Sequence, residues 1–354
     1  DGVEDCDAID PAFLLDPTTN RLWLSYGTYF GFIRLVELDP KTGKRMPNNE
    51  ALNIAIDCEA TAMMYRDGWY YLLGTHGTCC DGANSTYNIV VGRSKNVTGP
   101  YLDNMGVDML KGGGKFVVGA SGSYVGPGHF GLLDLGDGVQ KFSCHYEADL
   151  VQGGRSVLGI RPLMWKNGWP VAGDNFKEGT YEIQSERSGY GLELAVDFVR
   201  MASGMRAFGR ALDGPVVPVA PQALDSVIGK WPAGNIDVRI GDYMFRPHQK
   251  WTITPVAGVG GYPGSPYFKI TIAGTNRALA ATADADVITV PAFTGAPEQL
   301  WRIDLLTDGT YRIMPKVVPN SKEALALTAV GNSTPTLARF DPASDKSRWN
   351  FKTP

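Results

Sequence analysis

The feature that most constrains the fold is a series of short strand–turn–strand patterns between residues 10 and about 172. "AFLL" and "RLWLSYG" flank the turn "DPTTN", and "TAMMY" and "WYYLLGT" flank "RDG". Asp-Pro and Asp-Gly are turn signals, and apolar residues that alternate with others over short runs indicate strands. Helical periodicity is nearly absent from this stretch. The pattern therefore predicts short antiparallel sheets that follow one another along the chain.

Serial sheets of this kind are typical of a β-propeller, in which each blade has about four strands and the blades surround a central channel. If each blade begins with its innermost strand, the residues just before those strands face the channel. These residues are Asp10 before "PAFLL", Glu59 before "ATAMMY" and His129 before "FGLLDL", with spacings of 49 and 70 residues. The pattern predicts a concave polar site at one end of the channel.

The composition supports an all-β chain and excludes two classes of partner. The 354 residues include 43 Gly, 23 Pro, 8 Trp, 15 Tyr and 14 Phe, which suits many short strands joined by turns. A net charge of −4 argues against nucleic acid, which needs a basic surface. No window of ~18 apolar residues predicts a membrane span, and no leader resembles a signal peptide. Because the first residue is Asp, we expect a processed or trimmed N-terminus.

The cysteines leave the redox state open. There are five, an odd number, and none forms a Cys-x-x-Cys pair: Cys6, Cys58, Cys79, Cys80 and Cys144. A complete disulfide framework is excluded, but one or two bridges would suit an exported protein. The adjacent pair in "GTHGTCCDG" forms either a vicinal disulfide or two thiols in a tight loop.

The sequence pattern changes after about residue 174, and a new pattern then occurs three times. Each copy ends in a tryptophan, and Trp251, Trp301 and Trp349 are 50 and 48 residues apart. This repetition predicts a β-trefoil over residues 174–354. It resembles the ricin-type lectin family, whose Gln-x-Trp signature is matched twice in full and once with Ser347 in place of Gln. The resemblance implies carbohydrate binding, with a role as a spacer as the alternative.

The first part, residues 1–173, resembles glycoside hydrolase family 43, most closely its arabinanase-like members. The resemblance rests on four segments in order: "DAIDPAFLLDPTTNRLWLSYG", "CEATAMMYRDGWYYLLGTHGTCC", "VGPGHFG" and "IRPLMWKNGWP". It implies a five-bladed propeller, of which this chain holds about three blades, and inverting hydrolysis of α-L-arabinofuranosides. The alternatives are a β-xylosidase, a galactosidase or a galactofuranosidase of the same fold, or a non-catalytic carbohydrate-binding protein.

The resemblance also assigns roles to the channel residues. It implies that Glu59 in "CEAT" is the general acid and that Asp10 in "AIDP" is the carboxylate that orients this acid and raises its pKa. An acid with an ordinary pKa of about 4.3 must have it raised to protonate a leaving oxygen near neutral pH, and a nearby anion does this. His129 in "GPGH" is implied to hold a central Ca²⁺ or Na⁺, or its water shell. No organic cofactor is expected.

Four further residues are expected to contact the sugar. Thr28 and Phe30 follow "LSYG", where the family lines its sugar pocket, and Arg161 matches an arginine near the carboxylates. We place Cys79 with them. Thr61 departs from the usual Glu-Ala-Pro motif, whose proline shapes the loop.

An inverting enzyme also needs a general base about 6.5–9.5 Å from the acid. In the family this base precedes the segment that matches Asp10, and here only nine residues precede Asp10. We expect the missing blades and the base on a second chain. A fragment that closes by oligomerising and a shortened binding protein are the alternatives. The expected partner is a plant-type polysaccharide or oligosaccharide, and the expected location is secreted or periplasmic.

Overall fold

The computed structural model describes residues 8–27, 31–196, 228 and 231–354 of the chain. The chain divides into two compact units, Asp1–Asp174 and Asn175–Pro354. Within the described residues the secondary structure consists of β-strands and short 3₁₀-helices, which confirms the all-β prediction. No helix of the described residues is long and apolar enough to cross a membrane.

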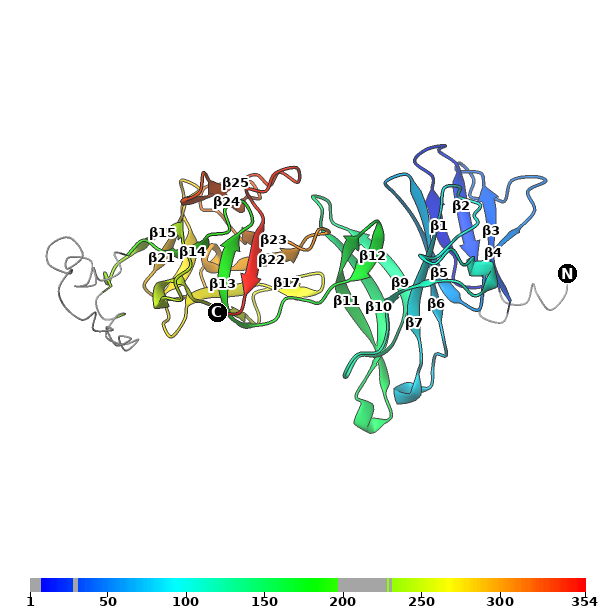
Figure 1. Cartoon of the computed structure of the whole chain (residues 1–354), viewed down its shortest axis with the longest axis horizontal. Coiled ribbons are helices and arrows are strands. Elements are labelled where there is room, and N and C mark those ends of the chain that lie inside the picture. The colour runs from blue at the N-terminus through cyan, green and yellow to red at the C-terminus, as the bar shows by residue number, and fades with distance from the viewer. Residues whose placement is uncertain (1–7, 28–30, 197–227, 229–230) are drawn as a thin grey trace, which may run out of the picture. The chain divides into compact units, whose positions relative to one another are not determined.

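The first unit contains three four-stranded antiparallel sheets, which lie side by side in Figure 1. The first sheet consists of β1 (Ala12–Leu15), β2 (Leu22–Tyr26), β3 (Phe32–Leu38) and β4 (Leu52–Ile56). The second consists of β5 (Glu59–Arg66), β6 (Trp69–His76), β7 (Asn88–Ser94) and β8 (Lys115–Val118). The third consists of β9 (Val125–Asp134), β10 (Gln140–Ala148), β11 (Arg155–Lys166) and β12 (Trp169–Ala172). Three 3₁₀-helices lie in the connections: η2 (Gly82–Asn84), η3 (Met109–Lys111) and η4 (Leu150–Gln152).

Local turn chemistry explains the tight hairpin between β5 and β6. Arg66 pairs with Trp69, so only two residues form the turn. Asp67 has φ 50° and Gly68 has φ 78°. Two consecutive left-handed residues match the twist of the flanking strands, and Asp-Gly is a favoured sequence for them. The hairpin predicted from "RDG" is therefore present.

The middle sheet is buried on both faces, and β6 shows this most clearly. Tyr70 and Leu72 pack into a core with the first sheet, whereas Tyr71 and Leu73 pack into a second core with the third sheet. Alternate residues of a strand point to opposite faces, so a strand buried on both sides has an apolar sequence without alternation. The run "WYYLLGT" is such a sequence.

The second unit is a closed β-structure. A ten-stranded sheet runs in the order β14-β15-β21-β20-β19-β16-β13-β26-β23-β22, and the extra pairings β14–β13 and β19–β22 join it back on itself. Its strands are β13 (Gly179–Ser185), β14 (Gly191–Leu194), β15 (Ile236–Gly241), β16 (Trp251–Pro255), β19 (Phe268–Ile272), β20 (Ala278–Ala281), β21 (Val287–Val290), β22 (Trp301–Leu305), β23 (Tyr311–Pro315) and β26 (Trp349–Lys352). The remaining elements are β17 (Gly261–Tyr262), β18 (Ser265–Pro266), β24 (Ala326–Val330), β25 (Thr334–Ala338), η5 (Pro247–Gln249) and η6 (Pro297–Gln299).

The three predicted tryptophans occupy equivalent places in this unit. Trp251, Trp301 and Trp349 have no exposed surface. Each indole Nε1 donates a hydrogen bond to a leucine carbonyl, at 2.7, 2.9 and 2.8 Å; the acceptors are Leu192, Leu279 and Leu327. The same contact in each repeat confirms the threefold pattern read from the sequence.

The departure in the third repeat has a local explanation. In the first two repeats the glutamine of Gln-x-Trp accepts a backbone N–H five residues earlier, from Met244 at 2.8 Å and from Thr294 at 2.7 Å. In the third repeat the hydroxyl of Ser347 instead lies 2.7 Å from that of Thr328. Both hydroxyls are buried, and the bond gives the hydroxyl of Ser347 the hydrogen-bond partner that a buried polar group needs.

Candidate active site

Two of the three predicted channel residues lie at the start of a strand. Asp10 comes just before β1 and Glu59 begins β5, but His129, expected just before a strand, is the fifth residue of the ten-residue β9. Asp10 has φ 51°, Ala60 next to Glu59 has φ 48°, and His129 has φ 60°. Left-handed backbone is uncommon for residues other than glycine and occurs often at functional sites. Each of the three segments therefore contains a residue in this uncommon conformation.

Hydrogen bonds between neighbouring sheets hold two of these segments, those of Glu59 and His129. The hydroxyls of Ser25 in β2 and Thr61 in β5 are buried and lie 3.1 Å apart. In the same way, the buried hydroxyl of Thr75 in β6 accepts the backbone N–H of His129 in β9 at 2.8 Å. Thr61, which stands where the family motif has proline, thus ties the Glu59 segment to the first sheet.

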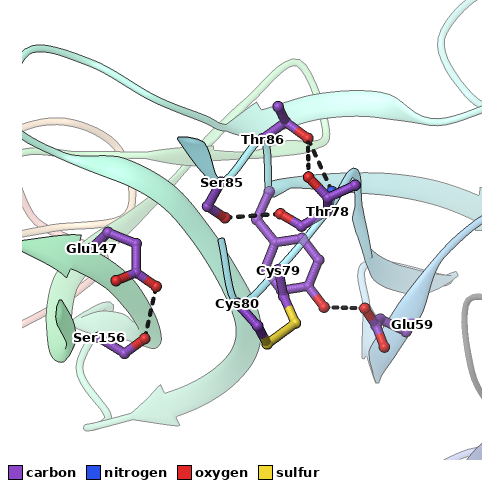
Figure 2. The surroundings of a disulfide bond; sticks show 9 residues. Glu59, Thr78, Cys79, Cys80, Ser85, Thr86, Glu147 and Ser156 are labelled. Carbon is purple, nitrogen blue, oxygen red and sulfur yellow. Dashed lines mark hydrogen bonds between the residues drawn. A yellow bond between two sulfur atoms is a disulfide. The ribbon is translucent and has the colours of Figure 1, made fainter. Parts of the chain in front are cut away.

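The carboxyl group of Glu59 is held by a residue that the sequence analysis did not single out. Glu59 is half-buried, and the hydroxyl of Tyr87 donates a hydrogen bond to its Oε1 atom (Figure 2). The pairing of β5 with β6 shifts register between Glu59 and Ala62, so the acid lies at a β-bulge. Bulges re-aim side chains and are common next to active sites.

His145 packs beside Tyr87 and interacts electrostatically with Glu59, with His129 and with a second glutamate, Glu147. The ring of His145 is 5.6 Å from that of Tyr87. Burial lowers the pKa of His145 and the charge of His129 lowers it further, whereas the carboxylates of Glu147 and Glu59 act in the opposite direction. Glu59, His129 and Glu147 are therefore each near enough to His145 to interact with it electrostatically.

Glu147 is another residue that the sequence analysis missed. Its side chain is buried, and its Oε1 accepts a hydrogen bond from the hydroxyl of Ser156 at 2.7 Å (Figure 2). His145 lies two positions before it on β10. Strand register brings β10 beside β9, because His145 pairs with Gly128 next to His129.

The two adjacent cysteines form a disulfide, which settles the alternative left open by the sequence. Cys79 and Cys80 are bonded at 2.08 Å (Figure 2). The hydroxyl of Thr86 accepts the backbone N–H of Thr78 at 2.9 Å, which closes the base of the loop that carries the disulfide. Cys58 and Cys144 are free and buried, and Cys6 lies outside the described residues. Burial raises the pKa of the Cys58 thiol to about 12.

Of the other residues predicted to contact the sugar, the structure describes only some. Thr28 and Phe30 lie outside the described residues. The guanidinium of Arg161 donates to the carbonyl of Gly173 and to Asp174 Oδ1, both at 2.9 Å. These partners belong to the end of the first unit. A sugar contact of Arg161, and one of Cys79, stays a prediction.

The expected cation at His129 also stays a prediction. Among the described residues, no group of three or more His, Cys, Asp or Glu side chains is arranged to hold a metal ion. Calcium prefers six to eight oxygen ligands, and the nearby carboxylates of Glu59 and Glu147 already accept hydrogen bonds from Tyr87 and Ser156. The side chains that the structure describes do not supply a ligand set for such a cation.

The second unit has a buried charged cluster in its first repeat. Glu193 accepts hydrogen bonds from Arg239 and from the side chain of Gln249, both at 2.6 Å. Burial would raise the pKa of Glu193, but hydrogen bonds from His248, Arg239 and Gln249 outweigh it and lower the pKa. Ala280 and Thr328 occupy the corresponding positions, each directly after the leucine that accepts the tryptophan N–H. The three repeats therefore differ at this position.

The first unit thus has an all-β scaffold with carboxyl and imidazole groups on β5, β9 and β10 that interact electrostatically with His145, and the second has a threefold tryptophan repeat. Residues 3–170 match the family model of glycosyl hydrolases family 43, and residues 247–339 match that of ricin-type β-trefoil lectin-like domains. The first unit is therefore a family 43 glycosyl hydrolase segment, and the second contains a ricin-type β-trefoil domain.

Individual proteins similar to the first unit carry arabinanase names. The extracellular endo-α-(1→5)-L-arabinanase 1 of Bacillus subtilis is 38% identical over 169 residues, which cover 46% of this chain and 50% of that protein. The extracellular exo-α-(1→5)-L-arabinofuranosidase ArbA of Cellvibrio japonicus is 34% identical over 180 residues, which cover 46% and 51%. The solved structure of Cellvibrio cellulosa α-L-arabinanase has 31% identity and a TM-score of 0.45, and covers 49% of this chain and 60% of that one. The chain spans about half the length of the two named enzymes.

Proposed function

We propose that the protein is a glycosidase that hydrolyses α-L-arabinofuranosidic linkages in arabinan or an arabinose-containing polysaccharide, with inversion. The observation that carries the proposal is the Glu59 carboxyl group, which lies at a bulged strand start, accepts a hydrogen bond from Tyr87 and interacts electrostatically with His145. It lies in a segment that matches a glycosidase family, and similar proteins are named as arabinanases.

In this mechanism Glu59 is the general acid and Asp10 is the carboxylate that orients it. Glu59 gives its proton to the glycosidic oxygen as the bond to the anomeric carbon breaks, and the leaving group departs as a neutral hydroxyl. Packing of β1 against β5 supports the role of Asp10, because it brings the two strands together. Water attacks from the opposite face of the sugar and passes a proton to a carboxylate base.

We assign this base to a blade outside the present chain, on a second chain. Support comes from the outer face of β1, where Phe13 is 59% exposed and Leu15 is 55% exposed. Two large apolar side chains on one face of a short edge strand favour a covering partner. Native mass spectrometry of the purified protein tests the assignment. A bound chain with an acidic residue essential for cleavage supports it, and full activity of the 354-residue chain alone contradicts it.

The trefoil unit is proposed to hold the polymer, and the protein is proposed to be secreted. The lectin-like family match supports the first proposal, and retardation by arabinan in affinity electrophoresis tests it. The Cys79–Cys80 disulfide and the extracellular relatives support the second, because disulfides persist in oxidising compartments.

Cleavage of linear arabinan, with the stereochemistry followed by NMR, tests the activity. Release of the β-anomer first supports an inverting arabinanase. Release of xylose or galactose from their polymers, with no release of arabinose from arabinan, would indicate a xylosidase or a galactosidase instead. Binding without any cleavage would indicate the carbohydrate-binding protein.

A further inference from the structure

We propose that Tyr87 is a positioning residue for the general acid, and that it decides which oxygen of Glu59 delivers the proton. The inference rests on the proposed role of Glu59 as the acid. The hydroxyl of Tyr87 donates to Oε1 of Glu59. A neutral carboxyl group that accepts a hydrogen bond at Oε1 carries its own proton on the other oxygen. Oε2 is therefore the atom that protonates the leaving group.

The packing around Tyr87 leaves its ring little freedom. Tyr87 is 5% exposed. It packs against Gly128, where a Cβ atom would lie 2.5 Å from Cδ2 of Tyr87 and 2.7 Å from Cγ2 of Thr75. The ring of His145 lies 5.6 Å away, measured between ring centroids. The ring is therefore enclosed by groups from β6, β9 and β10, and from this position its hydroxyl donates to Oε1 of Glu59.

The backbone before Tyr87 is also fixed. Thr86 lies at the base of the disulfide loop, where its hydroxyl is 2.9 Å from the hydroxyl of Thr78. The hydroxyl of Ser85 donates to the carbonyl of Thr78 at 2.8 Å. These bonds join the two ends of the loop, so Tyr87 enters β7 from a closed turn. Tyr87 is thus held by its ring packing and by its backbone.

The hydrogen bond from Tyr87 to Glu59 strengthens during the reaction. Before proton transfer, Oε1 is the carbonyl oxygen of a neutral acid. When Oε2 gives its proton to the glycosidic oxygen, the electron pair of that O–H bond stays on Glu59, and the negative charge is shared with Oε1. Hydrogen bonds to charged acceptors are stronger than those to neutral ones. Tyr87 therefore stabilises the transition state more than the bound substrate, which raises kcat and leaves KM unchanged.

The test compares Tyr87→Phe with Tyr71→Phe. Tyr71 is a matched control in the same sheet, because its buried ring also donates a hydroxyl hydrogen bond, to the carbonyl of Gly168 at 2.7 Å. Each variant is assayed on an arabino-oligosaccharide, whose leaving group must be protonated, and on 2,4-dinitrophenyl α-L-arabinofuranoside, whose leaving group need not be. The protein is assayed together with any chain that copurifies with it.

For Tyr87→Phe we expect kcat on the oligosaccharide to fall about 5- to 30-fold, with KM changed less than about twofold and little loss on the aryl substrate. Tyr71→Phe should change neither kcat nor KM on either substrate. Equal losses on both substrates, or a change in KM alone, would overturn the positioning role, because a structural defect has no preference for the poorer leaving group.

A measurement without turnover separates this inference from the proposed function. The melting temperature is measured for the wild-type protein, Tyr87→Phe, Glu59→Ala and the double variant. We expect Tyr87→Phe to lower it less in the Glu59→Ala background than in the wild-type background, because the hydrogen bond is already lost. Additive shifts would overturn the inference even if arabinan is cleaved. Absence of cleavage by the wild-type protein would overturn the proposed function, and the melting shifts would still decide the hydrogen bond.

Discussion

Replacing Gly128 by alanine tests the packing that holds the candidate acid, without touching the acid itself. A Cβ atom at this position would lie 2.5 Å from a ring carbon of Tyr87 and 2.7 Å from a methyl carbon of Thr75. Both distances are far below van der Waals contact. Tyr87 is 5% exposed and Thr75 is fully buried, so neither can relieve the overlap by moving into solvent. The ring of Tyr87 must therefore shift.

The cost follows from the overlap. Adding a methyl group to a filled core costs about 1–3 kcal/mol, and we expect the free energy of unfolding to fall by about that amount. A shifted ring also withdraws its hydroxyl from Glu59 Oε1, so kcat on arabino-oligosaccharides should fall about tenfold. Both losses have one cause, the displacement of Tyr87.

Urea denaturation and steady-state kinetics measure the two losses, with Gly234→Ala as the control. A Cβ at Gly234 meets no atom within 4 Å, so that variant should match the wild type in both assays. The reasoning is refuted if Gly128→Ala is as stable and as active as the wild type. It is also refuted if stability falls while the oligosaccharide and aryl substrates are affected equally.

Three further predictions follow from other contacts. Asp16→Asn should lower the free energy of unfolding by about 2–3 kcal/mol at pH 7, because the buried carboxylate accepts hydrogen bonds from two threonines and from Tyr70. Burial alone would raise the pKa of Asp16, but these bonds outweigh it and lower the pKa. The stabilisation should therefore be complete above about pH 4 and lost as the pH falls below it, which acid titration of both proteins measures. Thr61→Val should reduce kcat while Thr61→Ser keeps it, because only the serine preserves the bond to Ser25; equal kcat values for the two variants would contradict this. Iodoacetamide at pH 8 should leave Cys58 unmodified in the native protein, because burial raises the pKa of its thiol to about 12; rapid alkylation, seen by mass spectrometry, would contradict it.

The sheets of the first unit could be predicted from sequence because their signals are local. The Asp67-Gly68 turn and the flanking apolar runs lie within a dozen residues of one another. The same holds for Glu59, which begins an apolar strand, whereas His129, expected just before a strand, lies inside β9. Both residues were singled out by motif position and both act electrostatically on His145, but their roles stay predictions.

Tyr87 and Glu147 could not be found in this way, because their places depend on register. Glu59 and Ile89 both pair with Thr75 in β6, and Tyr87 lies two residues before Ile89. Residues two apart share a face, so Tyr87 reaches the acid across three strands. A shift of one residue would reverse the face, and no local signal in "NSTYNIVV" sets that register.

Hydrolysis of linear arabinan by the wild-type protein and by Glu59→Gln tests the central claim most directly. The amide keeps the shape and the acceptor for Tyr87 but has no proton to give. The account predicts that kcat falls by about 100-fold or more, and that arabinan binding, measured by affinity electrophoresis, is retained. Undiminished cleavage by Glu59→Gln, or loss of binding with unchanged cleavage, would contradict it.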